Sequence, residues 1–277
     1  MPYGVRTRGG VECRGSPFGL RVQARPDGSG AARRVRDEAA PDRDAPGSDP
    51  ERRAGGHVPC DLLPRAARAA RAYITPDPGD GKRHPAILDL HSGFGGITDA
   101  LWTYFDYARP YRDAGIVHFT PTRRGENDNA GDFEVFWGEV DDAVASLRYL
   151  RSLPYVDPDR IYVTGHSTGG TLTLLLASET ADFRAAFSFE GTPVTGPWAQ
   201  QFIRDGQLPA LPYDDYEFLL RSPVVFAKSL RRPTFYFYGK DGAFSEVAPA
   251  YAAYGKEAGT PYLQTIEVAH ADHETVF

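Results

Sequence analysis

Residues 160–170 read Arg-Ile-Tyr-Val-Thr-Gly-His-Ser-Thr-Gly-Gly, and this stretch decides the fold. The β-branched and aromatic residues before Gly165 predict a strand, and the Leu-rich residues after Gly169 predict a helix. Between them lies the pattern Gly-x-Ser-x-Gly, with Ser167 at its centre. A sharp turn from strand to helix holds such a serine hydroxyl clear of its own backbone, and it closes only around small neighbours. The pattern therefore predicts that Ser167 is a nucleophile.

From residue 72 onward, short apolar runs alternate with amphipathic stretches, which is typical of a parallel sheet covered by helices. The expected strands are residues 86–90, 115–120, 161–164, 185–189, 234–238 and 264–268, with 73–75 as an earlier edge strand. The expected helices are residues 97–114, 137–153, 168–180 and 244–258. Residues 191–230 interrupt the alternation with prolines and aromatic residues, so they predict an irregular insertion that caps the substrate site.

A serine nucleophile needs a base that takes its proton and an acid that orients the base. His270 and His273 both follow the last expected strand, and we favour His273 because it lies further into the loop. Asp241 follows the expected strand 234–238 and is the favoured acid, which gives the chain order Ser167, Asp241, His273. Glu190 directly follows the neighbouring strand and is the alternative acid.

The tetrahedral intermediate of acyl transfer needs backbone N–H groups that stabilise its oxyanion. Thr168 is expected to supply one of them, because it begins the helix that follows the nucleophile. The second is expected from the glycine-rich residues 91–96, which follow the strand 86–90. Phe94 or Gly93 is the candidate donor there.

Four stretches together resemble the α/β-hydrolase superfamily. They are residues 91–96 (His-Ser-Gly-Phe-Gly-Gly), 124–129 (Arg-Gly-Glu-Asn-Asp-Asn), 154–170 and 271–273 (Ala-Asp-His). Within the superfamily, the chain is most similar to prolyl-oligopeptidase-type (S9) catalytic domains and dienelactone-hydrolase-like proteins, over residues 72–277. The resemblance implies a central, mostly parallel sheet with helices on both faces, a Ser-Asp-His triad and no cofactor.

Two positions depart from the family pattern. The His-Gly-Gly of the oxyanion loop is His91-Ser92-Gly93 here. The family acid usually lies three residues after the glycine that ends its strand; counted from Gly239, that position is Gly242, and Asp241 lies one residue earlier. The second departure bears directly on the choice between the two candidate acids.

Composition sets the broader expectations. The chain has 277 residues, and its net charge of −6 favours neither a nucleic acid nor a membrane as partner. Residues 1–72 carry +5, with 14 arginines and no lysine, and the remainder carries −11. Residues 1–71 are rich in Arg, Ala, Pro and Gly and predict a disordered leader; an Arg-rich nucleic-acid arm or a mis-called start are the alternatives. The two cysteines and the lack of a secretory signal predict a cytoplasmic location.

The sequence as a whole predicts a serine hydrolase that cleaves an ester or a peptide bond through an acyl-enzyme. Small esters and short peptides are the expected substrates, and neither a metal nor a cofactor is expected. The alternative is an inactive binding protein with the same fold. Residues 123–127 (Arg-Arg-Gly-Glu-Asn) are either a solvated charged loop or part of the wall around the substrate. The oligomeric state is left open.

Overall fold

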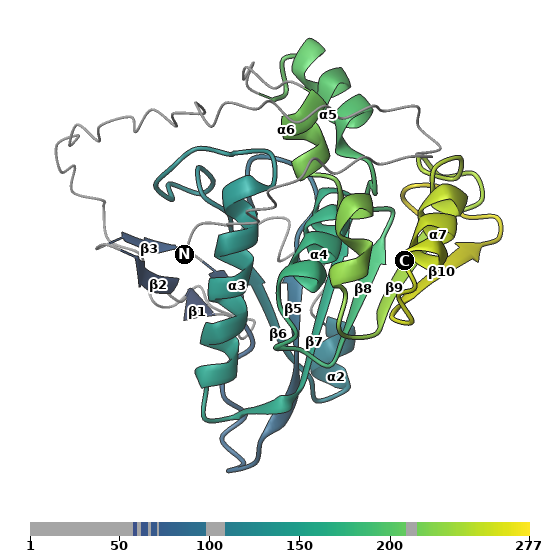
Figure 1. Cartoon of the computed structure of the whole chain (residues 1–277). Coiled ribbons are helices and arrows are strands. Elements are labelled where there is room, and N and C mark those ends of the chain that lie inside the picture. Colours follow the sequence, from purple (N-terminus) through teal and green to yellow (C-terminus); the bar gives the residue numbers. More distant parts are fainter. Residues whose placement is uncertain (1–57, 60–61, 66–67, 71, 98–108, 209–214) are drawn as a thin grey trace, which may run out of the picture. The chain divides into compact units, whose positions relative to one another are not determined.

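A computed structural model describes residues 58–59, 62–65, 68–70, 72–97, 109–208 and 215–277 (Figure 1). All of them belong to one unit, Ala54–Phe277. The expectations for residues 1–57, which make up most of the predicted leader, and for residues 98–108, which make up most of the first predicted helix, lie outside the described residues.

The central sheet is mostly parallel. Its strand order is β1-β4-β6-β5-β7-β8-β9-β10. The strands are β1 (Val58–Pro59), β4 (Ala72–Ile74), β5 (His84–Leu90), β6 (Val117–Pro121), β7 (Val156–His166), β8 (Ala185–Phe189), β9 (Thr234–Gly239) and β10 (Leu263–Val268). Strands β5 to β10 pair in parallel, whereas β4 is antiparallel to both of its neighbours. The predicted fold class and the six predicted strands are confirmed.

Strands also form inside the segment predicted to be disordered. β1 pairs with β4, and β2 (Leu62–Arg65) pairs with β3 (Arg68–Ala70) in a separate two-stranded sheet. These strands lie before residue 72, and the boundary at that residue stays a prediction. The composition argument counts apolar side chains, but strand pairing uses backbone groups that almost every residue carries, and the open edge of β4 offers partners.

Helices cover the sheet on both faces. They are α2 (Arg109–Asp113), α3 (Trp137–Ser152), α4 (Thr168–Glu179), α5 (Thr195–Arg204), α6 (Asp215–Leu220), the 3₁₀ helix η2 (Pro223–Ser229) and α7 (Ala248–Glu257). In Figure 1, α3 and α4 lie in front of the sheet and α2 lies behind it. The placement on opposite faces follows from right-handed crossover connections. The chain moves from β5 to β6 in one direction across the sheet and then returns past β5 to β7, so the helices of these two connections lie on opposite faces. Among the described residues, no helix combines the length and the apolar character needed to cross a bilayer.

Helix α4 is the centre of the core. Every residue from Thr168 to Ala177 is buried, because the helix is enclosed by the sheet, α3 and η2. A helix that is apolar on all sides is expected in such a position. The start of α4, which carries the nucleophile turn, is therefore held by packing on every side.

The predicted cap is more regular than expected. Residues 191–230 contain α5, α6 and η2 instead of irregular structure alone. The prolines were interpreted as helix breakers, but Pro197 and Pro223 lie in the first turns of α5 and η2. No intrahelical hydrogen bond is lost there, because the N–H groups of a first turn have no acceptor within the helix. In η2, Val224 and Ala227 join a buried cluster with α4 and β9, so this part belongs to the body of the domain and not to a cap.

Helix α4 approaches the end of β5 so closely that Gly169 has no room for a methyl group. A Cβ at Gly169 would overlap the backbone carbonyl oxygen of Leu90. Backbone atoms cannot rotate away, so we expect Gly169→Ala to push α4 off the sheet and to lower the free energy of unfolding by about 3 kcal/mol or more. Urea denaturation measures the change.

Gly196→Ala is the matched control, because its Cβ would lie 3.4 Å from Cβ of Phe218, an ordinary contact. We expect it to change stability by less than about 0.5 kcal/mol. A Gly169→Ala protein as stable as this control would contradict the packing described here.

Candidate active site

Ser167 lies in a strained turn between β7 and α4. Its backbone angles are φ 56° and ψ −119°, a region that residues with a Cβ rarely adopt. The backbone N–H of Ser167 donates to the carbonyl oxygen of Phe189 at 2.9 Å, which ties the turn to the end of β8. Strain of this kind costs about 1–3 kcal/mol and persists where the surrounding structure enforces it. The predicted strand-turn-helix context of Ser167 is present.

The side chain of His273 connects Ser167 to Glu190. Nε2 of His273 lies 3.0 Å from Oγ of Ser167, and Nδ1 lies 3.2 Å from Oε2 of Glu190. A carboxylate only accepts, so Nδ1 carries the ring proton and leaves Nε2 free to accept the serine O–H. His270, the other candidate base, is exposed and has no hydrogen bond to Ser167 among the described contacts. The structure brings together the ends of β7 and β8 and the loop after β10.

The structure places Glu190, the alternative acid, beside His273. Glu190 is fully buried and contacts His273, whereas Asp241 is exposed. The backbone N–H of Asp241 donates to the carbonyl of Ala271 at 3.0 Å, which holds the loop before His273, but within the described structure its carboxylate makes no hydrogen bond to that ring. The favoured residue, Asp241, therefore does not meet the imidazole, and the alternative, Glu190, occupies the position beside it.

The end of β9 is shaped to receive the Glu190 carboxylate. The backbone N–H of Gly239 donates to its Oε1 at 2.7 Å. A Cβ at Gly242 would overlap Oε1 and would lie 2.7 Å from Cδ. The family resemblance places the acid at position 242, so here the carboxylate of Glu190, directly after β8, fills the space beside that position. A glycine at 242 together with a glutamate directly after β8 was the sequence signal that could have revealed this.

His166 supports the loop that carries His273, and sequence reasoning missed it. Its Nε2–H donates to the backbone carbonyl of His273 at 2.6 Å, and the two rings lie 4.8 Å apart. Burial lowers the pKa of His166, so the neutral ring is favoured. The middle residue of the Gly-His-Ser motif therefore helps to place the imidazole beside the serine.

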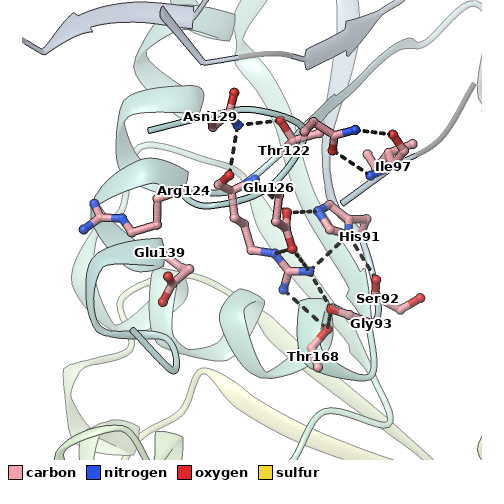
Figure 2. Close-up of polar contacts among 12 residues, drawn as sticks. His91, Ser92, Gly93, Ile97, Thr122, Arg124, Glu126, Asn129, Glu139 and Thr168 are labelled. Carbon is pink, nitrogen blue, oxygen red and sulfur yellow. Dashed lines mark hydrogen bonds and ion pairs between the residues drawn. The ribbon is translucent and has the colours of Figure 1, made fainter. Parts of the chain in front are cut away.

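The predicted oxyanion loop approaches the start of α4. The carbonyl oxygen of Gly93 accepts a hydrogen bond from Oγ1 of Thr168 at 3.1 Å (Figure 2). It also accepts one from the guanidinium of Arg123 at 2.6 Å. In a planar trans peptide the N–H points away from the C=O, so the N–H of Phe94 points away from these two side chains. This favours Phe94 over Gly93 as the donor. The N–H of Thr168 lies in the first turn of α4, where no intrahelical acceptor exists.

Arg123 and Glu126 form a buried ion pair beside this loop. Each side chain is 4% exposed, and their charged atoms lie 3.0 Å apart. Burial by itself raises the pKa of Glu126, but the hydrogen bond from His91 and the charge of Arg123 outweigh it and bring the pKa to about 2. The interpretation of residues 123–127 as a solvated charged loop is therefore wrong for both residues.

An aromatic cluster adjoins the oxyanion loop. Its members are Phe94, Phe133, Phe136, Trp198 and Phe202. The ring centroids of Phe94 lie 5.4 Å from Phe202 and 5.9 Å from Trp198. Helix α5, from the predicted cap, therefore packs directly against the loop that carries the proposed oxyanion donor.

Within the part of the chain that the structure describes, no three His, Cys, Asp or Glu side chains are grouped so as to hold an ion. That no metal or cofactor takes part stays a prediction.

With this sheet and this strand-turn-helix site, the chain is an α/β-hydrolase-fold protein. Residues 102–195 match the prolyl oligopeptidase family. An uncharacterized peptidase of Bacillus subtilis, YuxL, is 27% identical over 174 residues, which are 57% of this chain and 26% of that protein. The predicted resemblance is confirmed by these matches and by the structural neighbours.

Two solved structures illustrate the structural likeness. A puromycin-hydrolyzing peptidase of Mycobacterium tuberculosis superposes with a TM-score of 0.62 at 22% identity, covering 78% of this chain and 36% of that one. A putative dienelactone hydrolase of Klebsiella pneumoniae superposes with a TM-score of 0.55 at 18% identity, covering 79% of this chain and 88% of that one. The chain thus spans about a quarter of the Bacillus relative and about a third of the mycobacterial peptidase.

Glu139, in the first turn of α3, predicts a pH dependence of stability. Its Oε1 accepts the N–H of Glu134 at 2.9 Å, whereas the buried Oε2 has no hydrogen-bond partner among the residues that the structure describes. Burial raises the pKa of Glu139 from 4.5 to about 7. Between these values the unfolded chain is ionised and the folded chain keeps its proton, so the free energy of unfolding falls as the pH rises, by at most about 3 kcal/mol.

The isosteric change Glu139→Gln keeps the acceptor for Glu134 and removes the titration. We expect its stability relative to wild type to improve by up to about 3 kcal/mol between about pH 5 and pH 8, measured by urea denaturation at each pH. Glu179→Gln, at the exposed end of α4, is the control and should follow wild type throughout. A constant difference between Glu139→Gln and wild type would contradict the expected titration.

Proposed function

We propose that this protein is a serine hydrolase in which Ser167, His273 and Glu190 form the catalytic triad. The observation that carries the proposal is the hydrogen-bonded chain from Oγ of Ser167 through His273 to Glu190, with distances of 3.0 Å and 3.2 Å, at a strained strand-to-helix turn. A nucleophile within hydrogen-bond distance of a base, itself oriented by a third group, is the arrangement that acyl transfer requires.

In the proposed reaction, Nε2 of His273 takes the proton of Ser167 as Oγ attacks the substrate carbonyl. The buried Glu190 holds the ring in the tautomer that allows this and stabilises the imidazolium that forms. The carbonyl oxygen becomes negative, and the N–H groups of Thr168 and Phe94 stabilise it. His273 then protonates the leaving group, and water attacks the acyl-enzyme by the same steps in reverse.

Esters and short peptides are the proposed substrates. The names of the relatives support both bond types, because a peptidase and a putative dienelactone hydrolase share the fold. The aromatic cluster around Phe94 supports an apolar group near the reacting carbonyl. A cytoplasmic location belongs to the same proposal.

The alternative was an inactive binding protein of the same fold. The reason for considering it was that Asp241 lies one residue before the position of the family acid. Glu190 weakens this reason, because its buried carboxylate lies beside His273. Reaction with a fluorophosphonate probe separates the two functions, since only an activated serine is labelled.

We expect Ser167→Ala to abolish both fluorophosphonate labelling and p-nitrophenyl ester turnover, because the nucleophile is lost. Glu190→Gln should lower kcat by about 10³–10⁴-fold, since an amide cannot hold the imidazole in the required tautomer. Asp241→Asn is the matched control and should leave kcat unchanged. Full activity of Glu190→Gln, together with loss of activity in Asp241→Asn, would restore Asp241 as the acid.

Gly242→Ala tests the same carboxylate without altering any triad residue. The added methyl group would overlap Oε1 of Glu190, and the end of a side chain can give way more easily than a backbone can. We therefore expect little loss in the free energy of unfolding but a fall in kcat of about 10–100-fold, because Glu190 moves away from His273. Stability and steady-state kinetics of the one variant give both quantities. Unchanged kcat would contradict the role of Glu190.

A further inference from the structure

The guanidinium of Arg123 bridges the two chain segments that carry the proposed oxyanion donors. It donates to the carbonyl of Gly93 at 2.6 Å and to Nδ1 of His91 at 3.1 Å, both in the oxyanion loop. It also lies 3.5 Å from Oγ1 of Thr168, the first residue of α4. Figure 2 shows how near His91, Gly93 and Thr168, the partners in these contacts, lie to one another. The oxyanion loop and the helix therefore share one rigid partner.

These contacts set the direction of the Phe94 N–H. Because the peptide between Gly93 and Phe94 is planar and trans, fixing its carbonyl oxygen also fixes the N–H on its opposite side. Two donors hold that oxygen, Arg123 at 2.6 Å and Oγ1 of Thr168 at 3.1 Å. Gly93 has φ 73°, so its own backbone would tolerate other orientations of this peptide. The side-chain contacts, and not the conformational preference of Gly93, therefore select one orientation of the peptide between Gly93 and Phe94.

Glu126 in turn holds Arg123. Its Oε1 accepts Nε–H of Arg123 at 3.1 Å, and its Oε2 accepts the backbone N–H of the same residue at 2.9 Å. Oε2 also accepts Nε2–H of His91 at 3.0 Å. Nδ1 of His91 lies 3.1 Å from Arg123, which only donates, and 3.0 Å from the carbonyl oxygen of Ser92, which only accepts. The contact of Nε2 with Glu126 places the ring proton on Nε2, so Nδ1 of the neutral ring accepts from Arg123. Each member of this buried group thus orients the next.

A further contact pins the far end of the oxyanion loop. The side chain of Asn127 accepts the N–H of Ile97 at 2.9 Å and donates to its carbonyl at 2.7 Å. Residues 123–127 therefore hold the oxyanion loop at both ends, at His91 and Gly93 on one side and at Ile97 on the other. A loop so restrained can keep its N–H groups aimed while substrate enters and leaves.

Stability alone does not account for this arrangement. A buried ion pair often stabilises a protein no more than apolar side chains of similar size would, because both charges lose their water. What apolar side chains cannot do is hold a carbonyl oxygen in a set direction. The neighbouring Arg124 offers a comparison, since its ion pairs with Asp142 and Glu134, both at 2.8 Å, contact neither the oxyanion loop nor α4.

We propose that Arg123, held by Glu126, is a positioning residue that aims the N–H of Phe94 at the oxyanion and keeps it in register with the N–H of Thr168. This inference rests on the proposed hydrolase function. Arg123 itself contacts no substrate; it acts through the carbonyl of Gly93. Its loss is therefore expected to weaken stabilisation of the transition state while leaving binding of the uncharged substrate carbonyl nearly unchanged.

The test compares Arg123→Met with the matched Arg124→Met in the full chain, using p-nitrophenyl butyrate. Both changes remove an ion pair and both are expected to lower stability. Only Arg123→Met should lower kcat, by about 100-fold with a nearly unchanged KM, as expected when an oxyanion donor is lost or misaligned. Arg124→Met should keep kcat close to wild type. Equal kcat values for the two variants would overturn the proposal.

Chemical rescue distinguishes positioning from general damage. Arg123→Ala leaves a space of the shape of the missing side chain, so guanidinium chloride, at concentrations below the onset of unfolding, should raise its kcat, and sodium chloride at equal ionic strength should not. Ser167→Ala should not be rescued. Failure of guanidinium to raise kcat in a folded Arg123→Ala would count against the proposal.

Two further results separate the possible failures. If Arg123→Met does not fold, Arg123→Lys provides the test: it keeps the charge beside Glu126 but cannot reach Gly93 and Thr168 together, and its kcat should still fall. A wild-type protein that neither turns over the ester nor reacts with a fluorophosphonate would refute the proposed function itself. Wild-type turnover with full activity in Arg123→Lys and Arg123→Met would refute only the positioning role.

Discussion

The close approach of α4 to the sheet is the constraint on which the rest of the structure depends. Gly169 lies against the carbonyl of Leu90 at the end of β5, and Gly170 lies against the carbonyl of Phe189 at the end of β8. Glycine at both positions lets the helix begin between two strand ends, with no side chain in between. The strained backbone of Ser167 is the consequence, because the chain must turn from strand to helix within a single residue. Packing around Thr168 to Ala177, the buried part of α4, enforces that strain.

Around this turn, two sets of contacts bring the remaining groups into place. On one side, Glu190 lies in the space beside Gly242, accepts the N–H of Gly239 and orients His273. On the other side, the Arg123 and Glu126 pair holds the carbonyl of Gly93 and thereby the direction of the neighbouring N–H. Both sets use buried charged groups whose partners are backbone groups as well as side chains. Such contacts fix direction, which apolar packing does not.

Much of this could be predicted from the sequence, and the errors have a common cause. The six core strands and the positions of the proposed nucleophile, base and oxyanion loop follow from local patterns: apolar runs, a Gly-x-Ser-x-Gly turn, and a histidine directly after the last strand. The sequence favoured Asp241 as the partner of His273, and the structure places Glu190 there, because both residues follow a strand and only side-chain packing distinguishes them. The strands before residue 72 and the helices within 191–230 were missed because composition and proline content describe propensity, whereas pairing with β4 and burial against α4 decided the outcome.

The sequence by itself determined the class of fold and the strand-turn-helix position of Ser167, the proposed nucleophile, because both depend on the spacing of small and apolar residues along a short stretch of chain. The tertiary structure alone decided which carboxylate meets His273, which histidine supports it, and that Arg123 is buried instead of solvated. The physical reason is that a charged group is placed by the partners that compensate its loss of water, and those partners come from strands and loops far apart in the sequence.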